Sequence, residues 1–220
     1  MHLSYTYDPE VWPALVTLAI AVFLGWHGWQ RRNYSGTTPF VALCLFVSLW
    51  VLGSVFEISA TDFSAKVFWV KFQGIWQLPA ATAMTWSVLE LANLRRWLTR
   101  RIFWLMTIPS LLTLLLIATN DYHHLITTEF RMTDHVVQVF GIANWVLTAY
   151  AFLLILHAVI ALIWLALRSP RLRRPAIIML LGMVVGFGFY TLASISPALL
   201  RPGERILLVL GPISLYVSRF

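Results

Sequence analysis

One hydrophobic stretch, residues 67–91, carries the polar and aromatic side chains that are best placed to do chemistry. At 100° per residue, one face of a helix over this stretch holds Trp69, Gln73, Trp76, Gln77, Ala80, Met84 and Ser87. Amides that face lipid are costly, so this face is predicted to point into a helix bundle. Two interpretations stay open. Either Gln73 and Gln77, framed by Trp69 and Trp76, line a small-molecule pocket, or they hydrogen-bond to neighbouring backbone and hold helices together.

Acidic and basic side chains occur near the ends of the second and third hydrophobic stretches. Lys71 lies nearly opposite the glutamine face, about one helical turn inside the outer boundary. It can reach back to the membrane surface or pair with Glu57, near the outer end of the preceding stretch. Glu57 and Lys71 therefore join the ligand-pocket candidates. Glu90 is followed by Arg95 and Arg96, which predicts a local ion pair at the other membrane surface.

The segment 119–135 gathers residue types that bind metals. It holds Asp121, His123, His124, Glu129, Asp134 and His135. These side chains ligate zinc or copper in other proteins, but their spacing matches no fixed metal motif. We interpret the segment as an exposed polar loop that holds no metal, with Asn120, His123 and His124 as outer-loop candidates for contact with a ligand.

The types and depths of the polar residues also weigh against two kinds of membrane protein, retinal proteins and intramembrane hydrolases. A retinal protein needs a lysine deep in the bundle, and the only intramembrane lysine is Lys71, near one surface. Intramembrane hydrolases need several histidines and carboxylates at mid-depth, and the sequence offers scattered single residues. We therefore predict no catalytic residues and no cofactor.

Composition identifies the elements that must position these residues. Hydrophobic residues make up 60% of the 220 residues and charged residues 11%, against about 25% charged in soluble domains. Helices of about 20 apolar residues cross a bilayer, and the sequence predicts one domain of seven such helices, at 11–29, 38–58, 67–91, 102–118, 140–167, 176–199 and 206–220. The last reaches only about 22 Å at 1.5 Å per residue, so we expect the native chain to continue beyond residue 220.

Arginines between the stretches predict how the bundle lies in the membrane. One set of connections and ends holds Arg31, Arg32, Arg95, Arg96, Arg100, Arg101, Arg168, Arg171, Arg173, Arg174 and Arg219, and the opposite set holds only Lys66, Lys71, Arg131, Arg201 and Arg205. The first set marks the cytoplasm, so the N-terminus is outside and the C-terminus inside. The net charge of +7 comes from basic residues that punctuate apolar runs, which does not favour nucleic acid as a partner. The lipid bilayer is the expected surrounding.

The outer connection after the fourth stretch is the longest. Its second half and the following residues 136–140 are rich in β-formers around a Thr-Asp turn. The pattern predicts a short β-hairpin over the mouth of an otherwise all-α bundle.

Four groups of residues give the chain a resemblance to a known family. They are, in order, Phe68-Trp69 with Leu89-Glu90-Leu91 and Arg95-Arg96-Trp97-Leu98; Thr119-Asn120 with His123-His124-Leu125; Phe140-Gly141-Ile142-Ala143-Asn144-Trp145 with Tyr150; and Arg173-Arg174 with Leu180-Leu181-Gly182. In this order the chain resembles the seven-transmembrane input region at the N-terminus of bacterial sensor histidine kinases. The resemblance places Asn144 and Trp145 at the entry of the fifth helix and adds them to the pocket candidates. It implies the bacterial cytoplasmic membrane, a homodimer, and a PAS, kinase or cyclase output domain after residue 220.

The leading interpretation is a transmembrane sensor. It detects an extracellular or membrane cue and passes it through the seventh helix to a cytoplasmic output domain, a histidine kinase or a cyclase. A small-solute transporter is the first alternative, although the halves show neither an internal repeat nor paired broken helices. A non-catalytic subunit of a larger membrane complex is the second.

Overall fold

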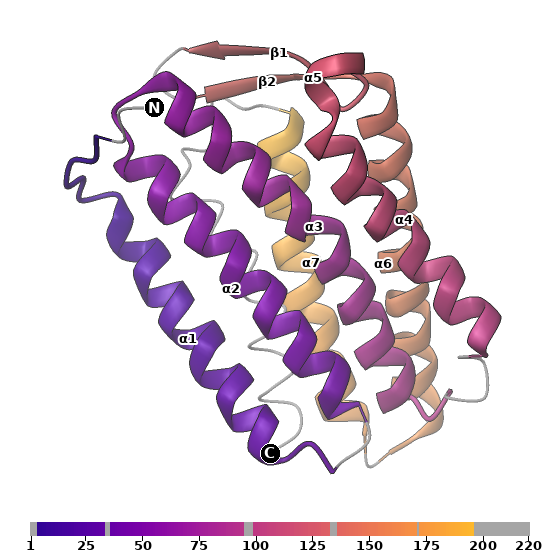
Figure 1. The fold of residues 1–220 in the computed structure, drawn as a ribbon. Helices are drawn as coiled ribbons and strands as arrows, with labels where there is room; N and C mark the ends of the chain where they lie inside the picture. The colour runs from indigo at the N-terminus through magenta and orange to yellow at the C-terminus, as the bar shows by residue number, and fades with distance from the viewer. Residues whose placement is uncertain (1–3, 34–35, 95–98, 133–135, 171, 196–220) are drawn as a thin grey trace.

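The computed structural model describes residues 4–33, 36–94, 99–132, 136–170 and 172–195 (Figure 1). The helices are α1 (Val11–Gln30), α2 (Thr37–Ser59), α3 (Phe63–Leu91), α4 (Arg100–Ala118), α5 (Asn120–His123), α6 (Ile142–Arg168) and α7 (Arg173–Ile195), and the strands are β1 (Thr127–Met132) and β2 (Val136–Phe140). Two predictions fall outside the described residues. They are the end of the sixth stretch at residue 199 and the whole seventh stretch, 206–220. The short α5 was not predicted.

Local signals explain where two of the long helices begin. Asp62 caps α3, because its carboxylate accepts hydrogen bonds from the backbone N–H groups of Ser64 and Ala65 at 3.1 and 3.3 Å. A further hydrogen bond from the Ser64 hydroxyl, together with these, lowers the pKa of Asp62 below its ordinary value. Thr99 caps α4 in the same way, through the N–H of Ile102 at 3.4 Å.

Two prolines lie inside helices. Pro79 stands in the middle of α3 and Pro109 in the middle of α4. Each removes the backbone N–H that would bond the carbonyl four residues earlier, which loosens the helix at that point.

α3 is the central helix of the bundle. α1 packs against α2 and α2 against α3, while α3 also packs against α4 and α6, and α6 packs against α7 (Figure 1). The main buried core joins α1, α2, α3, α6 and α7 through side chains such as Ala21, Leu43, Ala83, Leu162 and Met179. The helices approach closely because alanine and glycine occupy many of the facing positions.

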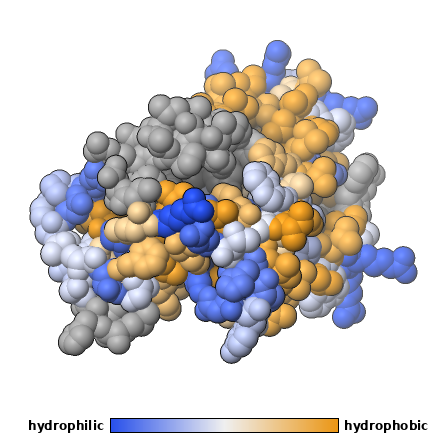
Figure 2. Space-filling model, turned by 90° about the horizontal axis from the view of Figure 1, so that it is seen from above, coloured by the Kyte–Doolittle hydropathy of each residue, from blue (hydrophilic) through white to orange (hydrophobic). Residues whose placement is uncertain are grey.

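The outside of the bundle is apolar. Large hydrophobic side chains stand exposed on several helices, among them Phe23, Trp26, Leu105, Leu115, Trp145 and Leu167. Seen from the hairpin end, hydrophobic residues reach the surface between the polar ones (Figure 2). Among the described residues, α1, α2, α4 and α6 are long and apolar enough to cross a membrane. An apolar surface of this extent on long helices is typical of a membrane protein.

The two ends of the bundle differ in charge. The hairpin end holds acidic side chains at Asp8, Glu10, Asp62, Asp121 and Glu129, whereas the helix ends and turns at the opposite end hold Arg31, Arg32, Arg100, Arg101, Arg168, Arg173 and Arg174 (Figure 1). The N-terminal residues belong to the hairpin end, because Tyr5 forms a β-bridge with Ala60 after α2. Of the described arginines, all but Arg131 of β1 therefore lie at the end opposite the hairpin.

The predicted hairpin is present. β1 and β2 pair antiparallel, with Phe130 opposite Gln138 and Met132 opposite Val136, and a bulge interrupts the register between Thr127 and Glu129. The side chain of Arg131 donates two hydrogen bonds, of 2.9 and 2.8 Å, to Glu129. This contact lowers the pKa of Glu129 below its ordinary value.

Candidate functional site

Two polar regions emerge from the fold. We call the first the outer cap, after the side of the membrane that the sequence predicts for it: α5, the hairpin and the connection up to Gly141. We call the second the α2–α3 seam: the facing surfaces of α2 and α3 from Phe46 to Phe56 and from Trp69 to Trp76, with Glu57 at the hairpin end. Together they contain most of the residues that the sequence marked as candidates.

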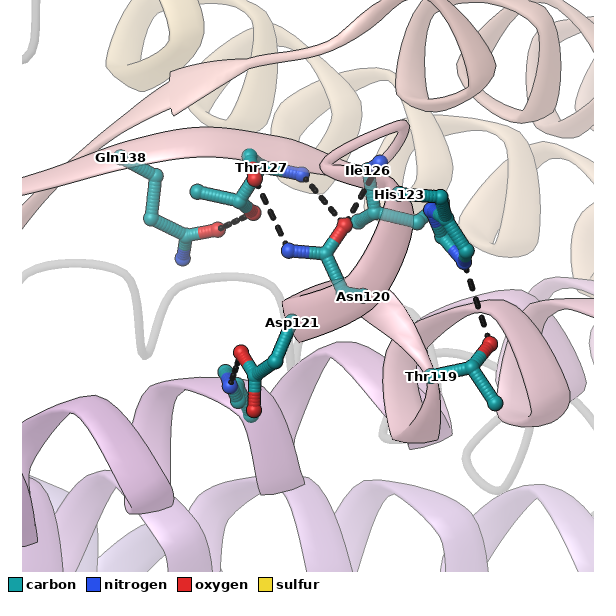
Figure 3. A network of polar contacts seen from close by, with 8 residues as sticks. Thr119, Asn120, Asp121, His123, Ile126, Thr127 and Gln138 are labelled. Carbon is teal, nitrogen blue, oxygen red and sulfur yellow. Dashed lines mark hydrogen bonds and ion pairs between the residues drawn. The ribbon is translucent and has the colours of Figure 1, made fainter.

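Asn120 organises the outer cap. It is 3% exposed, and its side-chain oxygen accepts the N–H groups of Ile126 and Thr127 at 2.9 and 3.1 Å (Figure 3). Its side-chain nitrogen donates to the Thr127 carbonyl at 2.8 Å. One amide thus ties α5 to the start of β1, and its partners are backbone groups of the protein itself. Asn120 is a structural residue of the cap.

Gly141 closes the cap from the other side. Its N–H donates to the carbonyl of Ile126 at 2.8 Å, and the N–H of Ala143 donates to that of Leu125 at 3.0 Å. A Cβ at this position would overlap the Leu125 carbonyl oxygen and lie 2.6 Å from its carbon. The glycine of the resemblance motif is needed here because two backbone segments meet without room for a side chain.

The histidines of the cap differ in role. His123 Nδ1 accepts the N–H of Leu125 at 3.0 Å, and Nε2 lies 3.1 Å from the Thr119 hydroxyl (Figure 3). A neutral ring in this setting must carry its proton on Nε2. His124 is exposed and ends α5 in the left-handed conformation, with φ 52°. Among the described residues no three metal-ligating side chains come together; His135 and Asp134 lie outside them.

Lys71 connects the cap to α3. Its ammonium group lies 2.5 Å from the Asp121 carboxylate, with side chains 24% and 73% exposed. The Asp121 side chain points away from the hairpin (Figure 3), and Phe130 of β1 lies 5.9 Å from the ammonium group. The pairing of Lys71 with Glu57 is not formed, because the Lys71 side chain reaches toward the hairpin end and pairs with Asp121 instead.

The α2–α3 seam buries three polar side chains in contact. Gln73 is 5% exposed and Glu57 is 3% exposed. The Gln73 amide donates to the Glu57 carboxylate at 2.6 Å and accepts from the Ser54 hydroxyl at 2.9 Å. Gln73 therefore points into the bundle as predicted, and its partners are side chains of α2 rather than backbone groups.

Gly53 gives Gln73 its space. A Cβ on Gly53 would lie 2.7 Å from the Cγ of Gln73 and 3.0 Å from a ring carbon of Phe72. The absent side chain lets α2 and α3 approach where the polar contacts form.

Aromatic rings continue along the same seam. Trp69 stacks on Phe56 with centroids 4.5 Å apart, and Trp76 stacks on Phe46 at 6.0 Å. The indole N–H of Trp69 donates to the Tyr5 hydroxyl at 3.2 Å. Trp76 differs, because its indole nitrogen is buried and has no hydrogen-bond partner among the described residues.

Three pocket candidates lie elsewhere. Gln77 is exposed, so the predicted inward orientation is wrong for this residue: α2 covers the side of α3 that holds Gln73 and leaves Gln77 uncovered. Trp145 is 61% exposed on α6 and packs edge-on against Phe140. Asn144 is half-buried beside it. Neither residue of this pair is a hydrogen-bond partner of Gln73, which is bonded to Glu57 and Ser54.

The half of α3 farther from the hairpin is bonded to α4, to α6 and to the turn before α2. The Thr82 and Ser110 hydroxyls are 3.0 Å apart across α3 and α4, and the Thr85 hydroxyl donates to the Leu154 carbonyl of α6 at 3.1 Å. Glu90 accepts the N–H of Gly36, just before α2, at 2.5 Å. It also accepts the Trp86 indole N–H at 3.0 Å. The predicted partners of Glu90, Arg95 and Arg96, lie outside the described residues.

These observations describe a bundle whose polar groups join helices to one another and tie the outer cap together. A family model for the N-terminal 7TM region of histidine kinase matches residues 13–214. No curated protein matches the sequence. Because the family model covers nearly the whole chain, the chain belongs to this family, which confirms the resemblance found in the sequence and fits a sensory membrane module.

Proposed function

We propose that this member of the histidine kinase 7TM family receives a cue at the outer face or within the membrane and passes it to a cytoplasmic output domain of the same chain. The family match over residues 13–214 carries the proposal. In this proposal seven helices cross the bacterial cytoplasmic membrane, the stretch 206–220 being the last, and the functional unit is a homodimer. The output domain is a histidine kinase or a cyclase.

The distribution of charge supports the orientation. Basic side chains in short connections stay in the cytoplasm, and the described arginines of the helix ends lie at the end opposite the hairpin. The outer cap and Tyr5 then face the exterior, and the turn before Arg100 faces the cytoplasm.

The contacts of α3 support a route for the signal. Lys71 joins α3 to the outer cap, Gln73 joins it to α2, and Glu90 joins it to the turn before α2 at the inner end. A ligand that binds one arrangement of these contacts better than another shifts the population by its differential affinity, and a few kcal/mol suffices. We place the cue-sensing region in the α2–α3 seam, with Trp69, Gln73, Trp76, Glu57 and Lys71 around it.

Thiol labelling tests the orientation. We would replace Cys44 by serine in the full-length protein and introduce one cysteine at Thr128 or at Arg100, both exposed. A membrane-impermeant maleimide on intact cells should label the Thr128 position alone, and the Arg100 position should react only after permeabilisation. The reverse pattern would contradict the proposed topology.

Phosphorylation tests the output. Inverted membrane vesicles that contain the full-length protein should incorporate phosphate from ATP on histidine if the output domain is a kinase. Gln73→Leu should shift the level of incorporation, because it changes the link between α2 and α3, whereas Gln77→Leu should leave it unchanged. Absence of both phosphate incorporation and cyclase activity in the wild-type vesicles would overturn the proposed function.

A further inference from the structure

The indole N–H of Trp76 is an unusual feature of the seam. The nitrogen is buried and has no hydrogen-bond partner among the described residues. Buried polar groups in folded proteins are nearly always paired, so each exception calls for an explanation. The other two tryptophans of α3 have acceptors: the indole N–H of Trp69 donates to Tyr5, and that of Trp86 donates to Glu90.

The depth of Trp76 restricts what the missing acceptor is. Trp76 lies near the middle of α3, with roughly 20 Å of helix on either side at 1.5 Å per residue. A bilayer core is about 30 Å thick, so the residue lies close to its midplane. Water is absent there, and the ester groups of phospholipids lie near the surfaces. An acceptor at this depth has to arrive on a molecule that dissolves in the hydrocarbon.

The surroundings restrict the chemistry further. Trp76 stacks on Phe46 and meets the edge of Phe72, at 6.0 and 5.8 Å between centroids. The ionisable side chains of this region already have partners: Lys71 is paired with Asp121, and the Glu57 carboxylate accepts the Gln73 amide. Nothing among these contacts would compensate a charge on the molecule. The environment fits an uncharged apolar compound that presents one oxygen acceptor.

We propose that Trp76 is the hydrogen-bond donor of a binding site for an uncharged, membrane-soluble compound that carries a carbonyl oxygen. The compound enters from the bilayer, packs its apolar part against Phe46 and Phe72, and accepts the indole N–H. As the cue, it would make the seam the point of detection, and that part rests on the proposed function. The binding itself does not.

The test observes the N–H directly. The full chain, with isotope-labelled tryptophan, is reconstituted in phospholipid nanodiscs, and Trp76→Phe identifies the Trp76 indole resonance. Methyl nonyl ketone is the probe, and dodecane, with the same number of heavy atoms and no acceptor, is the control. The Trp76 indole proton should move downfield with the ketone and stay in place with dodecane. The Trp69 resonance, whose N–H is already bonded to Tyr5, should stay in place with both.

Two results would overturn the proposal. One is a Trp76 resonance that does not move with the ketone. The other is a resonance that is already at a hydrogen-bonded position in nanodiscs without the probe, since the acceptor would then come from protein or lipid. A vesicle preparation that shows no output activity would contradict the proposed function and leave the indole shift unaffected, so the two failures are distinguishable.

Discussion

The outer cap and the α2–α3 seam both bury polar side chains, but they satisfy them differently. In the cap, Asn120 is bonded to backbone groups of residues 126 and 127, which hold one fixed geometry. In the seam, Gln73 is bonded to Glu57 and Ser54, which are side chains, and the nearby Trp76 indole nitrogen has no hydrogen-bond partner in the described part of the chain. This difference suggests separate roles for the two regions. The backbone contacts of Asn120 fix the shape of the cap, whereas we expect the side-chain contacts of Gln73 to change partners at a lower cost.

Gly141→Ala should have the largest effect, and it falls on the cap. The added methyl group overlaps the backbone of Leu125, so the connection must open, at a cost of roughly 3 kcal/mol or more. Thermal unfolding in detergent should show the loss, and trypsin should cut at Arg131 faster. Gly74→Ala is the matched control: its methyl group meets only the tip of the Ile117 side chain, at 3.2 Å, and alanine favours the helix. Equal loss in both variants would contradict the proposed rigidity of the cap.

Asn120→Ala comes next. It leaves the N–H groups of Ile126 and Thr127 without their acceptor, and a loss of about 2–3 kcal/mol follows. Asn120→Asp keeps the acceptor oxygen but sets a second oxygen against the Thr127 carbonyl at a buried position, so a loss of similar size is expected at neutral pH. Hydrogen exchange at residues 126 and 127 measures both variants. Unchanged protection in Asn120→Ala would show that the hairpin holds without this side chain.

Gln73→Leu probes the seam. It removes the amide that bonds Glu57 and Ser54 and leaves a buried carboxylate with a lost donor, at a cost of about 2 kcal/mol. Gln77→Leu, at an exposed position, should change stability by less than about 0.5 kcal/mol. Thermal unfolding in nanodiscs compares the two. If Gln77→Leu costs as much as Gln73→Leu, Gln77 is buried in the membrane-bound protein.

Asp121→Asn should have a small effect on the link between cap and α3. The carboxylate is largely exposed, and such pairs contribute about 0–1 kcal/mol and weaken with salt. The difference between wild type and variant in thermal unfolding should therefore shrink from low to high ionic strength. A difference that does not depend on salt would indicate that the Asp121 side chain acts through packing.

The smallest effect should come from acid. The pKa of Asp62 is lowered by its hydrogen bonds at the start of α3, so the charged form is favoured in the folded state. Its contribution to stability is present above the ordinary pKa of an aspartate and is lost as pH falls through the lowered value. Asp62→Asn should reduce the pH dependence of thermal unfolding in that range. The same dependence in both proteins would assign it to other carboxylates.

Much of the fold follows from the sequence, because the signals are local. Apolar runs predicted the long helices, and the β-formers around residues 133–134 predicted the hairpin. The count of seven crossings and the direction of the chain stay predictions. α5 was missed because four residues carry no periodicity.

The candidate site was less predictable, because it depends on which helices meet. Periodicity put Gln73 and Gln77 on one face, but only the packing of α2 decides that Gln73 is buried and Gln77 exposed. Lys71 pairs with Asp121, fifty positions away in the chain, after α4 has returned to the same end. The sequence marked Asn120 through the Thr119-Asn120 motif of the resemblance and as an outer-loop candidate for contact with a ligand, and neither signal could name its backbone partners.

Pro79 divides α3 into two parts with different attachments. The outer part is bound to the cap and to α2 through Lys71 and Gln73, and the inner part to α4, α6 and the turn before α2. The backbone bond that proline cannot form is the one that would stiffen the joint between them. We expect a change in the bend angle at Pro79 to tilt the part of α3 nearer the hairpin while the other part stays bound to α4 and α6. A displacement of the outer cap would then be transmitted along α3 to the turn before α2 that Glu90 holds.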